Sequence, residues 1–173
     1  SGENFCLPVG SKLDVEEIKF NSGGGGTNTA ATFALQGFKT AFYGVVGKDE
    51  AGQKIIQELK QFKIDSKFVK ATPERMTNHS IIILDNAHDR TILAYRGAAE
   101  LLKKEEIQFN KIQAKWWYVA PLSGLLCDAF PAIIEEAQKQ HIKVAINPSM
   151  AQLSLPNFPE MLKKVDILFL NQE

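Results

Sequence analysis

The second half of the chain alternates short apolar runs with helix-like runs, and this alternation limits the fold more than any other feature. The apolar runs cover residues 116–120, 143–146 and 166–170, and the helix-like runs cover residues 127–140 and 160–164. Strands that are apolar along most of their length are buried on both faces, which happens when helices cover both sides of a parallel sheet. We therefore predict a layered α/β fold with a mostly parallel sheet.

The first half of the chain contains further runs with strand or helix periodicity. We expect strands over residues 13–20 and 40–46, and helices over residues 28–36 and 49–62. Gly37 is expected to end the first of these helices, and Asp49 is the expected N-cap of the second. All of these elements fit one domain, since 173 residues are enough to bury a single core.

Residues 79–84 and 90–95 are predicted to form a β-hairpin around the turn-rich residues 85–89. Both strands are too apolar to stand free in water. Their apolar residues include Ile81, Ile82, Ile83, Ile92 and Leu93. We expect the rest of the domain, a ligand or a second subunit to cover them.

Charge and composition argue against several classes of function. Lysine plus arginine and aspartate plus glutamate each number 20, so the formal net charge is zero, and no basic stripe indicates a nucleic-acid partner. No apolar run reaches the roughly 18–20 residues that a membrane-spanning helix needs, and we expect a cytoplasmic protein. Cys6 and Cys127 are expected to be free thiols, and the cysteines and histidines lack the spacing of a metal site.

Four consecutive glycines, residues 23–26, precede Thr27 and Asn28 between a strand-like run and a helix-like run. A stretch without side chains lets a ligand approach the backbone, and the N–H groups at the start of the next helix attract polar or negative groups. The run therefore suits a hydroxyl-rich or phosphorylated small molecule. Flexible linkers also contain such glycines, so composition alone leaves both interpretations open.

Two other phosphate-binding motifs do not match the sequence. A Walker loop needs Ser or Thr after Gly-Lys, but Gly47-Lys48 is followed by Asp49, and the dinucleotide fingerprint needs Gly or Ala where Thr29 stands. Another Rossmann-like enzyme, such as a dehydrogenase or a deacetylase, would need that fingerprint or a metal-spaced set of His and Asp residues. The sequence has neither.

Ligands of open parallel α/β sheets bind beyond the carboxyl ends of the strands. Here the predicted strand 143–146 is followed by Asn147, and the predicted strand 166–170 is followed by Asn171. Asparagine side chains both donate and accept hydrogen bonds. A single asparagine often ends a strand for structural reasons alone, but two at one edge favour a binding role.

The stretch from the glycine run to Gly47 resembles the first signature of the ribokinase/PfkB family of carbohydrate kinases. The match is a Gly-Gly start followed at the family's intervals by Asn28, Ala30, Gly37 and Gly47. The resemblance implies that Gly24, Gly25 and Asn28 grip a small-molecule sugar substrate. It also implies that Arg96 reaches the substrate from a small β-lid, which closes over the sugar and forms a possible homodimer contact.

The resemblance continues into the second half of the chain, where it implies that Asn147 and Asn171 face the phosphates of ATP and the Mg²⁺ ion. Asn171 would begin the family's Asn-x-x-Glu motif. Glu173 occupies a variable position of that motif and receives no role.

The family's second signature, Asp-Thr-x-Gly-Ala-Gly-Asp, carries the catalytic base and does not occur in this sequence. The resemblance therefore implies a partial, ribokinase-like and Rossmann-like domain over residues 1–173. Its lid strands would lie within about residues 5–22 and 78–97, and its α/β core would cover residues 23–77 and 98–173.

In this interpretation the full-length protein transfers the γ-phosphoryl group of ATP to a sugar hydroxyl. This chain supplies the substrate platform and the lid, but no catalytic residue and no metal ligand. The alternative is a non-catalytic module that binds a sugar or a nucleoside.

Overall fold

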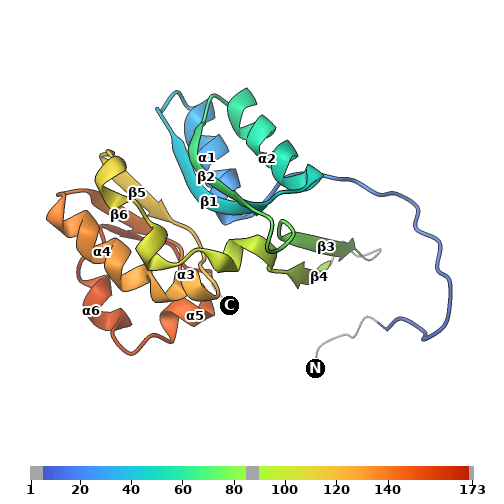
Figure 1. The fold of residues 1–173 in the computed structure, drawn as a ribbon. Helices are drawn as coiled ribbons and strands as arrows, with labels where there is room; N and C mark the ends of the chain where they lie inside the picture. Colours follow the sequence, from blue (N-terminus) through green and yellow to red (C-terminus); the bar gives the residue numbers. More distant parts are fainter. Residues whose placement is uncertain (1–5, 85–89, 172–173) are drawn as a thin grey trace.

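The computed structural model describes residues 6–84 and 90–171 and confirms the predicted α/β fold with parallel sheets (Figure 1). The α-helices are α1 (Gly25–Leu35), α2 (Glu50–Gln61), α3 (Leu125–Asp128), α4 (Phe130–Lys139), α5 (Met150–Leu153) and α6 (Phe158–Leu162). The strands are β1 (Ala41–Gly47), β2 (Asp65–Thr72), β3 (His79–Leu84), β4 (Arg90–Tyr95), β5 (Trp116–Val119), β6 (Lys143–Ile146) and β7 (Ile167–Leu168). The short 3-10 helices η1 (Gly97–Leu101), η2 (Lys104–Glu106) and η3 (Phe109–Lys111) connect β4 to β5.

The strands β1 and β2 form a parallel pair that is covered on both faces. On one face, Ala30 of α1 and Leu59 of α2 pack with Phe42 of β1. On the other face, Val45 of β1 packs against Ala98 of η1. Phe42 and Val45 point to opposite faces because side chains alternate along a strand.

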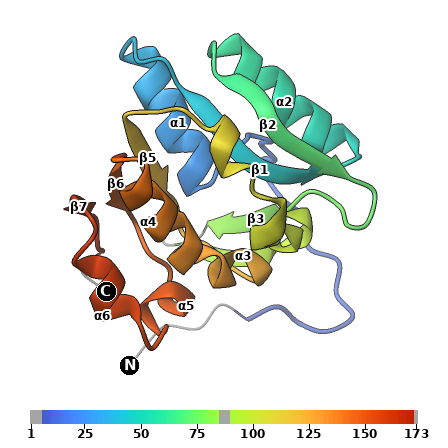
Figure 2. The same cartoon turned by 60° about the vertical axis from the view of Figure 1, so that its left-hand side comes forward.

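The strand β6 is the centre of a second parallel sheet, with β5 on one side and β7 on the other. Val144 and Ile146 of β6 are fully buried in one cluster with Phe130 and Ile134 of α4, and Figure 2 shows α4 lying across β5 and β6. Phe158 of α6 stacks on Phe130, with ring centroids 6.2 Å apart. The apolar run of β6 is thus buried as predicted. The run of residues 166–170 is not, since the side chains from Ile167 to Leu170 are between 37% and 58% exposed.

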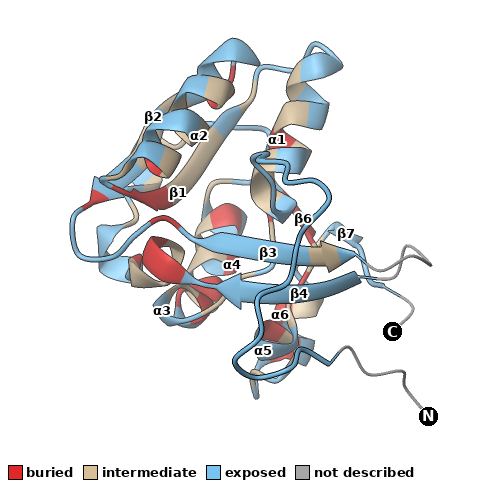
Figure 3. Ribbon diagram, turned by 90° about the vertical axis from the view of Figure 1, so that its right-hand side faces the viewer, coloured by how far each residue is buried: buried red, intermediate tan, exposed pale blue. Residues whose placement is uncertain are grey.

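The strands β3 and β4 form the predicted hairpin, in which Ile82 lies opposite Ile92 and Ile81 lies opposite Leu93. All four side chains are between 48% and 62% exposed, and Figure 3 shows the hairpin projecting with nearly all of its surface exposed. The described residues of the domain therefore do not cover the hairpin. The predicted turn, residues 85–89, lies outside the described residues.

The strand expected over residues 13–20 is absent, because the described residues 6–22 are coil and turn. The apolar side chains of this segment are more than half exposed: Leu13, Val15, Ile18 and Phe20. A strand needs a neighbour that pairs its N–H and C=O groups, and residues 6–22 pair with no described strand. The prediction of a lid strand within about residues 5–22 is therefore wrong for residues 6–22, and residue 5 lies outside the described residues.

The first helix begins at Gly25, earlier than the expected start at Asn28. Gly24 takes up the turn with a φ of 99°, so the next two glycines already belong to the first helical turn. The hydroxyl of Thr27 donates a hydrogen bond to the carbonyl of Gly23 at 2.6 Å, which holds this turn closed.

The helix expected over residues 127–140 is interrupted at Ala129, where α3 ends and α4 begins. Pro131 accounts for the interruption, because it has no N–H group to continue the hydrogen-bond ladder of α3. The strand expected over residues 166–170 is reduced to the two residues of β7. Asp49 is the N-cap of α2, as predicted, and its carboxylate accepts a hydrogen bond from the N–H of Gly52 at 2.8 Å.

Candidate functional site

The glycine run forms a tight bend between the coil of residues 6–22 and α1. At Gly24 the φ of 99° is a backbone conformation that a side chain rarely allows. A Cβ atom on Gly25 would lie 3.0 Å from Cδ of Pro121, and one on Gly26 would lie 3.0 Å from Cε2 of Phe42. The start of α1 thus packs so closely on the exit of β5 that side chains there would be crowded. We call residues 23–26 the glycine bend.

The glycine bend lies at the carboxyl edge of the second sheet, since Pro121 follows β5 almost directly. Asn147 occupies the same edge at the end of β6. Its backbone N–H donates to the carbonyl of Val119, and its Nδ2 donates to the carbonyl of Phe169, both at 3.0 Å. Asn147 therefore ties the exits of β5, β6 and β7 together, and it keeps one N–H bond and Oδ1 of its amide for other partners.

Two loops leave this edge, one after β5 and one after β6, and Gln152 joins them. Its Oε1 accepts hydrogen bonds from the N–H of Leu122 at 2.7 Å and from the N–H of Ser149 at 2.9 Å. Gln152 is fully buried, and its Nε2 has no hydrogen-bond partner among the described residues. Sequence reasoning missed this residue, although Ser149-x-x-Gln152 has the capping-box pattern that marks the start of α5.

The first turn of α1 presents N–H groups at the carboxyl edge. The N–H of Asn28 donates to the carbonyl of Gly24 at 3.1 Å and begins the helical ladder. The N–H groups of Gly25, Gly26 and Thr27 precede that ladder and have no partner within the helix. Together with the positive end of the helix dipole, they suit the oxygen atoms of hydroxyl or phosphate groups.

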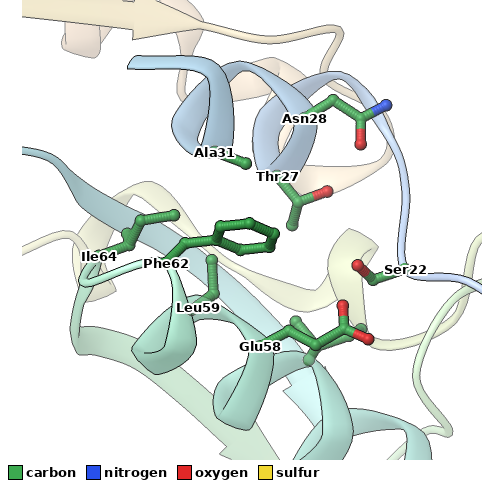
Figure 4. A pocket seen from close by; sticks show the side chains of 9 residues that line it. Ser22, Thr27, Asn28, Ala31, Glu58, Leu59, Phe62 and Ile64 are labelled. Carbon is green, nitrogen blue, oxygen red and sulfur yellow. The ribbon is translucent and has the colours of Figure 1, made fainter. Parts of the chain in front are cut away.

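Asn28 is exposed at the rim of a cavity of about 190 Å³ between α1 and α2. Leu59, Phe62 and Ile64 line the apolar side of this cavity, and Figure 4 shows the amide of Asn28 turned away from them. No hydrogen bond among the described residues joins this amide to the exits of β5, β6 or β7. Sequence reasoning missed the cavity, and Phe62, the last residue of the helix expected over residues 49–62, is 40% exposed.

Arg96 and Asn171 are both exposed. Arg96 directly follows β4 and precedes the buried Gly97 and Ala98 of η1. Asn171 lies just beyond the exit of β7, and the continuation of its predicted motif, residues 172–173, lies outside the described residues. Within the described residues, no hydrogen bond or ion pair joins Arg96 or Asn171 to the glycine bend.

The remaining candidates for reactive chemistry are metal-ligating side chains and Cys127. Over residues 6–84 and 90–171, no three His, Cys, Asp or Glu side chains gather as they would around a metal ion. Burial raises the pKa of the Cys127 thiol, and Asp128 adds to this effect, which disfavours the nucleophilic thiolate form. Over the same residues, no helix has the length and apolar character that crossing a membrane requires.

Comparison with known sequences gives an independent line of evidence. The family model for pfkB family carbohydrate kinases matches residues 3–173. A ribokinase from Staphylococcus aureus (strain COL) is 32% identical over 177 residues, and the match covers 98% of this chain and 55% of that protein.

Solved structures agree with the sequence comparison. The crystal structure of Sa239 superposes with a TM-score of 0.81 at 29% identity, covering 98% of this chain and 55% of the other. A putative ribokinase II from E. coli, in complex with ATP and Mg²⁺, has the same fold, with a TM-score of 0.74 at 16% identity over 95% of this chain and 57% of the other. The chain spans about half the length of these proteins.

Proposed function

Since the chain belongs to the pfkB family of carbohydrate kinases, we propose that the full-length protein transfers the γ-phosphoryl group of ATP to a hydroxyl group of a sugar or sugar-like molecule. One observation carries the proposal beyond family membership: the glycine bend is packed on the exit of β5, at the edge that Asn147 also occupies. Ligands of open parallel sheets bind at this edge, and the N–H groups of a helix start suit hydroxyl and phosphate oxygens.

The sugar side of the site consists of the start of α1 and the hairpin. Gly24 and Gly25 let a sugar approach the backbone, and the N–H groups of the first turn of α1 donate to its hydroxyl oxygens. Asn28 adds an amide that both donates and accepts. Arg96 stands at the base of the exposed hairpin, and we assign it a contact with the substrate from there.

ATP and Mg²⁺ belong to the same proposal, supported by the E. coli protein of the same fold that holds both. Asn147 and Asn171 are the residues that we assign to the nucleotide side. The described residues do not fit a Mg²⁺ site by themselves, because no cluster of acidic, His or Cys side chains converges within them. We therefore assign this chain no step that passes through the metal ion.

In the proposed reaction, residues 1–173 bind and orient the sugar and the nucleotide, and they do not transfer the proton. The sequence has no Asp-Thr-x-Gly-Ala-Gly-Asp stretch. We propose that the carboxylate that accepts the hydroxyl proton belongs to a part of the full-length protein outside residues 1–173. The 173-residue chain alone should then transfer no phosphate, and the requirement for ATP favours a cytoplasmic location.

The exposed hairpin supports a further part of this proposal, a homodimer in which the lids of two copies meet. Ile81, Ile82, Ile92 and Leu93 give both faces of the hairpin an apolar surface. A two-stranded hairpin alone is at best marginally stable in water, and a second copy would bury these side chains.

The test is a screen of the full-length protein against pentoses, hexoses, keto-deoxy sugar acids, sugar phosphates and nucleosides, with ATP and Mg²⁺. A substrate should raise the melting temperature and cause ADP to form. Failure of every sugar in both assays would refute the proposal.

A matched pair of variants locates the site. Gly25→Val should raise the sugar KM, since its side chain would collide with Pro121, whereas Gly23→Val should not, since a Cβ atom at Gly23 has no neighbour within 4 Å. Equal KM values for these two variants would show that the sugar binds elsewhere.

A further inference from the structure

The stretch from Gly47 to Gly52 has no role in the function proposed above, but it forms a dense hydrogen-bonded cluster. Gly47 ends β1, and Asp49 caps α2. The Asp49 carboxylate accepts three hydrogen bonds: from the N–H of Gly52 at 2.8 Å, the N–H of Thr77 at 2.7 Å and the hydroxyl of Thr77 at 2.6 Å. One of these bonds is an ordinary helix cap, and the other two reach a residue far along the chain.

Thr77 is the residue that makes this cluster more than a helix cap. It is fully buried and lies just before β3, at the first end of the hairpin. Its hydroxyl donates to Asp49 and accepts from the N–H of Gly47 at 2.9 Å. One end of the hairpin is thus hydrogen-bonded both to the end of β1 and to the start of α2.

The glycines of the cluster leave no room for side chains. A Cβ atom on Gly47 would lie 2.5 Å from the backbone nitrogen of Thr77, and one on Gly52 would lie 3.0 Å from the Thr77 hydroxyl. These distances are shorter than ordinary van der Waals contact, so the backbones of β1 and α2 close around Thr77. Glycine at positions 47 and 52 therefore leaves the space in which Thr77, at the base of the hairpin, packs between β1 and α2.

The second end of the hairpin is held at the same place. The N–H of Ala98 donates to the carbonyl of Met76 at 2.8 Å, which joins the segment after β4 to the segment before β3. A Cβ atom on Gly97 would collide with that carbonyl oxygen. Ala98 itself is fully buried against Val45 of β1.

Both faces of the hairpin beyond this base are exposed. The contacts at its base therefore determine how the hairpin is oriented relative to the rest of the protein. We propose that the hydrogen-bonded pair of Asp49 and Thr77 is the joint that fixes the angle of the hairpin β3–β4 relative to the body of the protein. Asp49 is then a positioning residue that acts through Thr77 and β4 on Arg96. The consequence for the sugar rests on the proposed function, whereas the joint itself does not.

The hydrogen bonds of Thr77, helped by the N–H of Gly52, hold the pKa of the Asp49 carboxyl below its ordinary value. The carboxylate is thus ionised at neutral pH, and charge-assisted hydrogen bonds of this kind are stronger than neutral ones. This agrees with a joint that holds a projecting element in one direction.

The joint can be broken in two ways that differ in their effect on α2. Asp49→Ser keeps an N-cap side chain that reaches Gly52 but is too short to reach Thr77. Thr77→Val removes only the hydroxyl group, and Thr77→Ser restores it. Ile134→Val is the control for a general loss of stability, because Ile134 is a fully buried residue of α4, far along the chain from the joint.

The direct measurement is the distance between spin labels on the hairpin and on α4 in the full-length protein. The labels are placed at Ser80→Cys and Lys139→Cys in a Cys6→Ser background, without sugar. Asp49→Ser and Thr77→Val should broaden the distance distribution, whereas Thr77→Ser and Ile134→Val should leave it narrow. An unchanged distance distribution in Asp49→Ser and Thr77→Val, or equal broadening in Ile134→Val, would contradict the proposed joint.

Kinetics of the full-length protein test the consequence for Arg96 and the sugar. Asp49→Ser and Thr77→Val should raise the sugar KM about tenfold and change kcat by less than about twofold, as expected when a binding contact is lost. Loss of folded enzyme alone would lower kcat and leave KM unchanged, which would count against a positioning role. If the wild-type protein phosphorylates no sugar, the proposed function fails, but the spin-label distances still decide whether the joint exists.

Discussion

Replacing Gln152 with leucine tests whether the hydrogen bonds of Gln152 hold together the two loops at the carboxyl edge. Leucine has a similar size but accepts no hydrogen bond, so the N–H groups of Leu122 and Ser149 lose their partner at 2.7 and 2.9 Å. A buried donor left without a partner costs ~1–3 kcal/mol. Both donors are only partly buried, so about 1.5 kcal/mol each is a reasonable value, or ~3 kcal/mol together.

The same substitution removes the Nε2 atom, which is buried without a partner among the described residues. Losing that desolvated group returns about 1 kcal/mol, so the net destabilisation should be ~2 kcal/mol. For a protein of this size, that corresponds to a fall in melting temperature of about 4–8 °C.

Urea unfolding of wild-type and Gln152→Leu protein measures this difference, and amide hydrogen exchange shows where it arises. The N–H groups of Leu122 and Ser149 should exchange faster in the variant. Gln138→Leu is the matched control, since Gln138 donates a single hydrogen bond at the surface, to Lys164, and should change stability by less than about 1 kcal/mol. A Gln152→Leu variant as stable as the control would refute the role of Gln152.

Three further predictions follow from the core, the joint and the hairpin. Phe130→Ala should destabilise the protein by about 3–5 kcal/mol in urea unfolding, since Phe130 is fully buried at the centre of the second sheet's core, and a loss below about 1 kcal/mol would contradict that packing. The hydrogen bonds of Thr77 lower the pKa of Asp49 in the folded protein. The ionised Asp49 therefore stabilises the folded state fully above its ordinary pKa of 3.8, and this stabilisation is lost as the pH falls through the lower folded-state pKa. Urea unfolding across this range should therefore show that the free energy of unfolding falls less with acid in Asp49→Ser than in wild type. Identical pH profiles would exclude a stabilising role of the Asp49 carboxylate. Ile82→Lys should reduce self-association of the full-length protein in light scattering, and an unchanged mass would show that the hairpin is not the contact between copies.

The sequence was most informative where a local pattern is enough to specify a structure. The continuous apolar runs predicted a parallel sheet buried on both faces. This is confirmed for the central strand β6, where Val144, Ala145 and Ile146 are buried, but not for β7, where Ile167 and Leu168 are exposed. The cap at Asp49 followed from residue type and position. Both features depend on neighbours along the chain or on the burial of one element, so no long-range information was needed.

The prediction for residues 13–20 was wrong because a strand exists only when another strand pairs with it. Alternation of apolar and charged residues describes side chains, and it does not supply a partner for the backbone. The early start of α1 was missed for a related reason. Glycine has a poor helix propensity, and here the first turn lies close against Pro121 and Phe42, which are distant in the sequence.

The sequence predicted some individual residues of the candidate site but not the contacts that join them. The rule that ligands bind at the carboxyl edge of a parallel sheet selected Asn147, and its backbone does tie the ends of neighbouring strands together. Gln152 and Thr77 are buried polar residues whose partners come from other elements. The capping-box pattern of Ser149-x-x-Gln152 marks a helix start but does not predict that Gln152 is buried, and Thr77 has no comparable signal.

The central claim is that a sugar binds at the glycine bend, and backbone amide NMR of the full-length protein with its sugar substrate tests it most directly. The account predicts that the amide signals of Gly25, Gly26 and Thr27 shift on titration with sugar, while those of the α2 face around Phe62 and Ile64 stay in place. Shifts confined to Phe62 and Ile64, in the cavity between α1 and α2, would contradict the account.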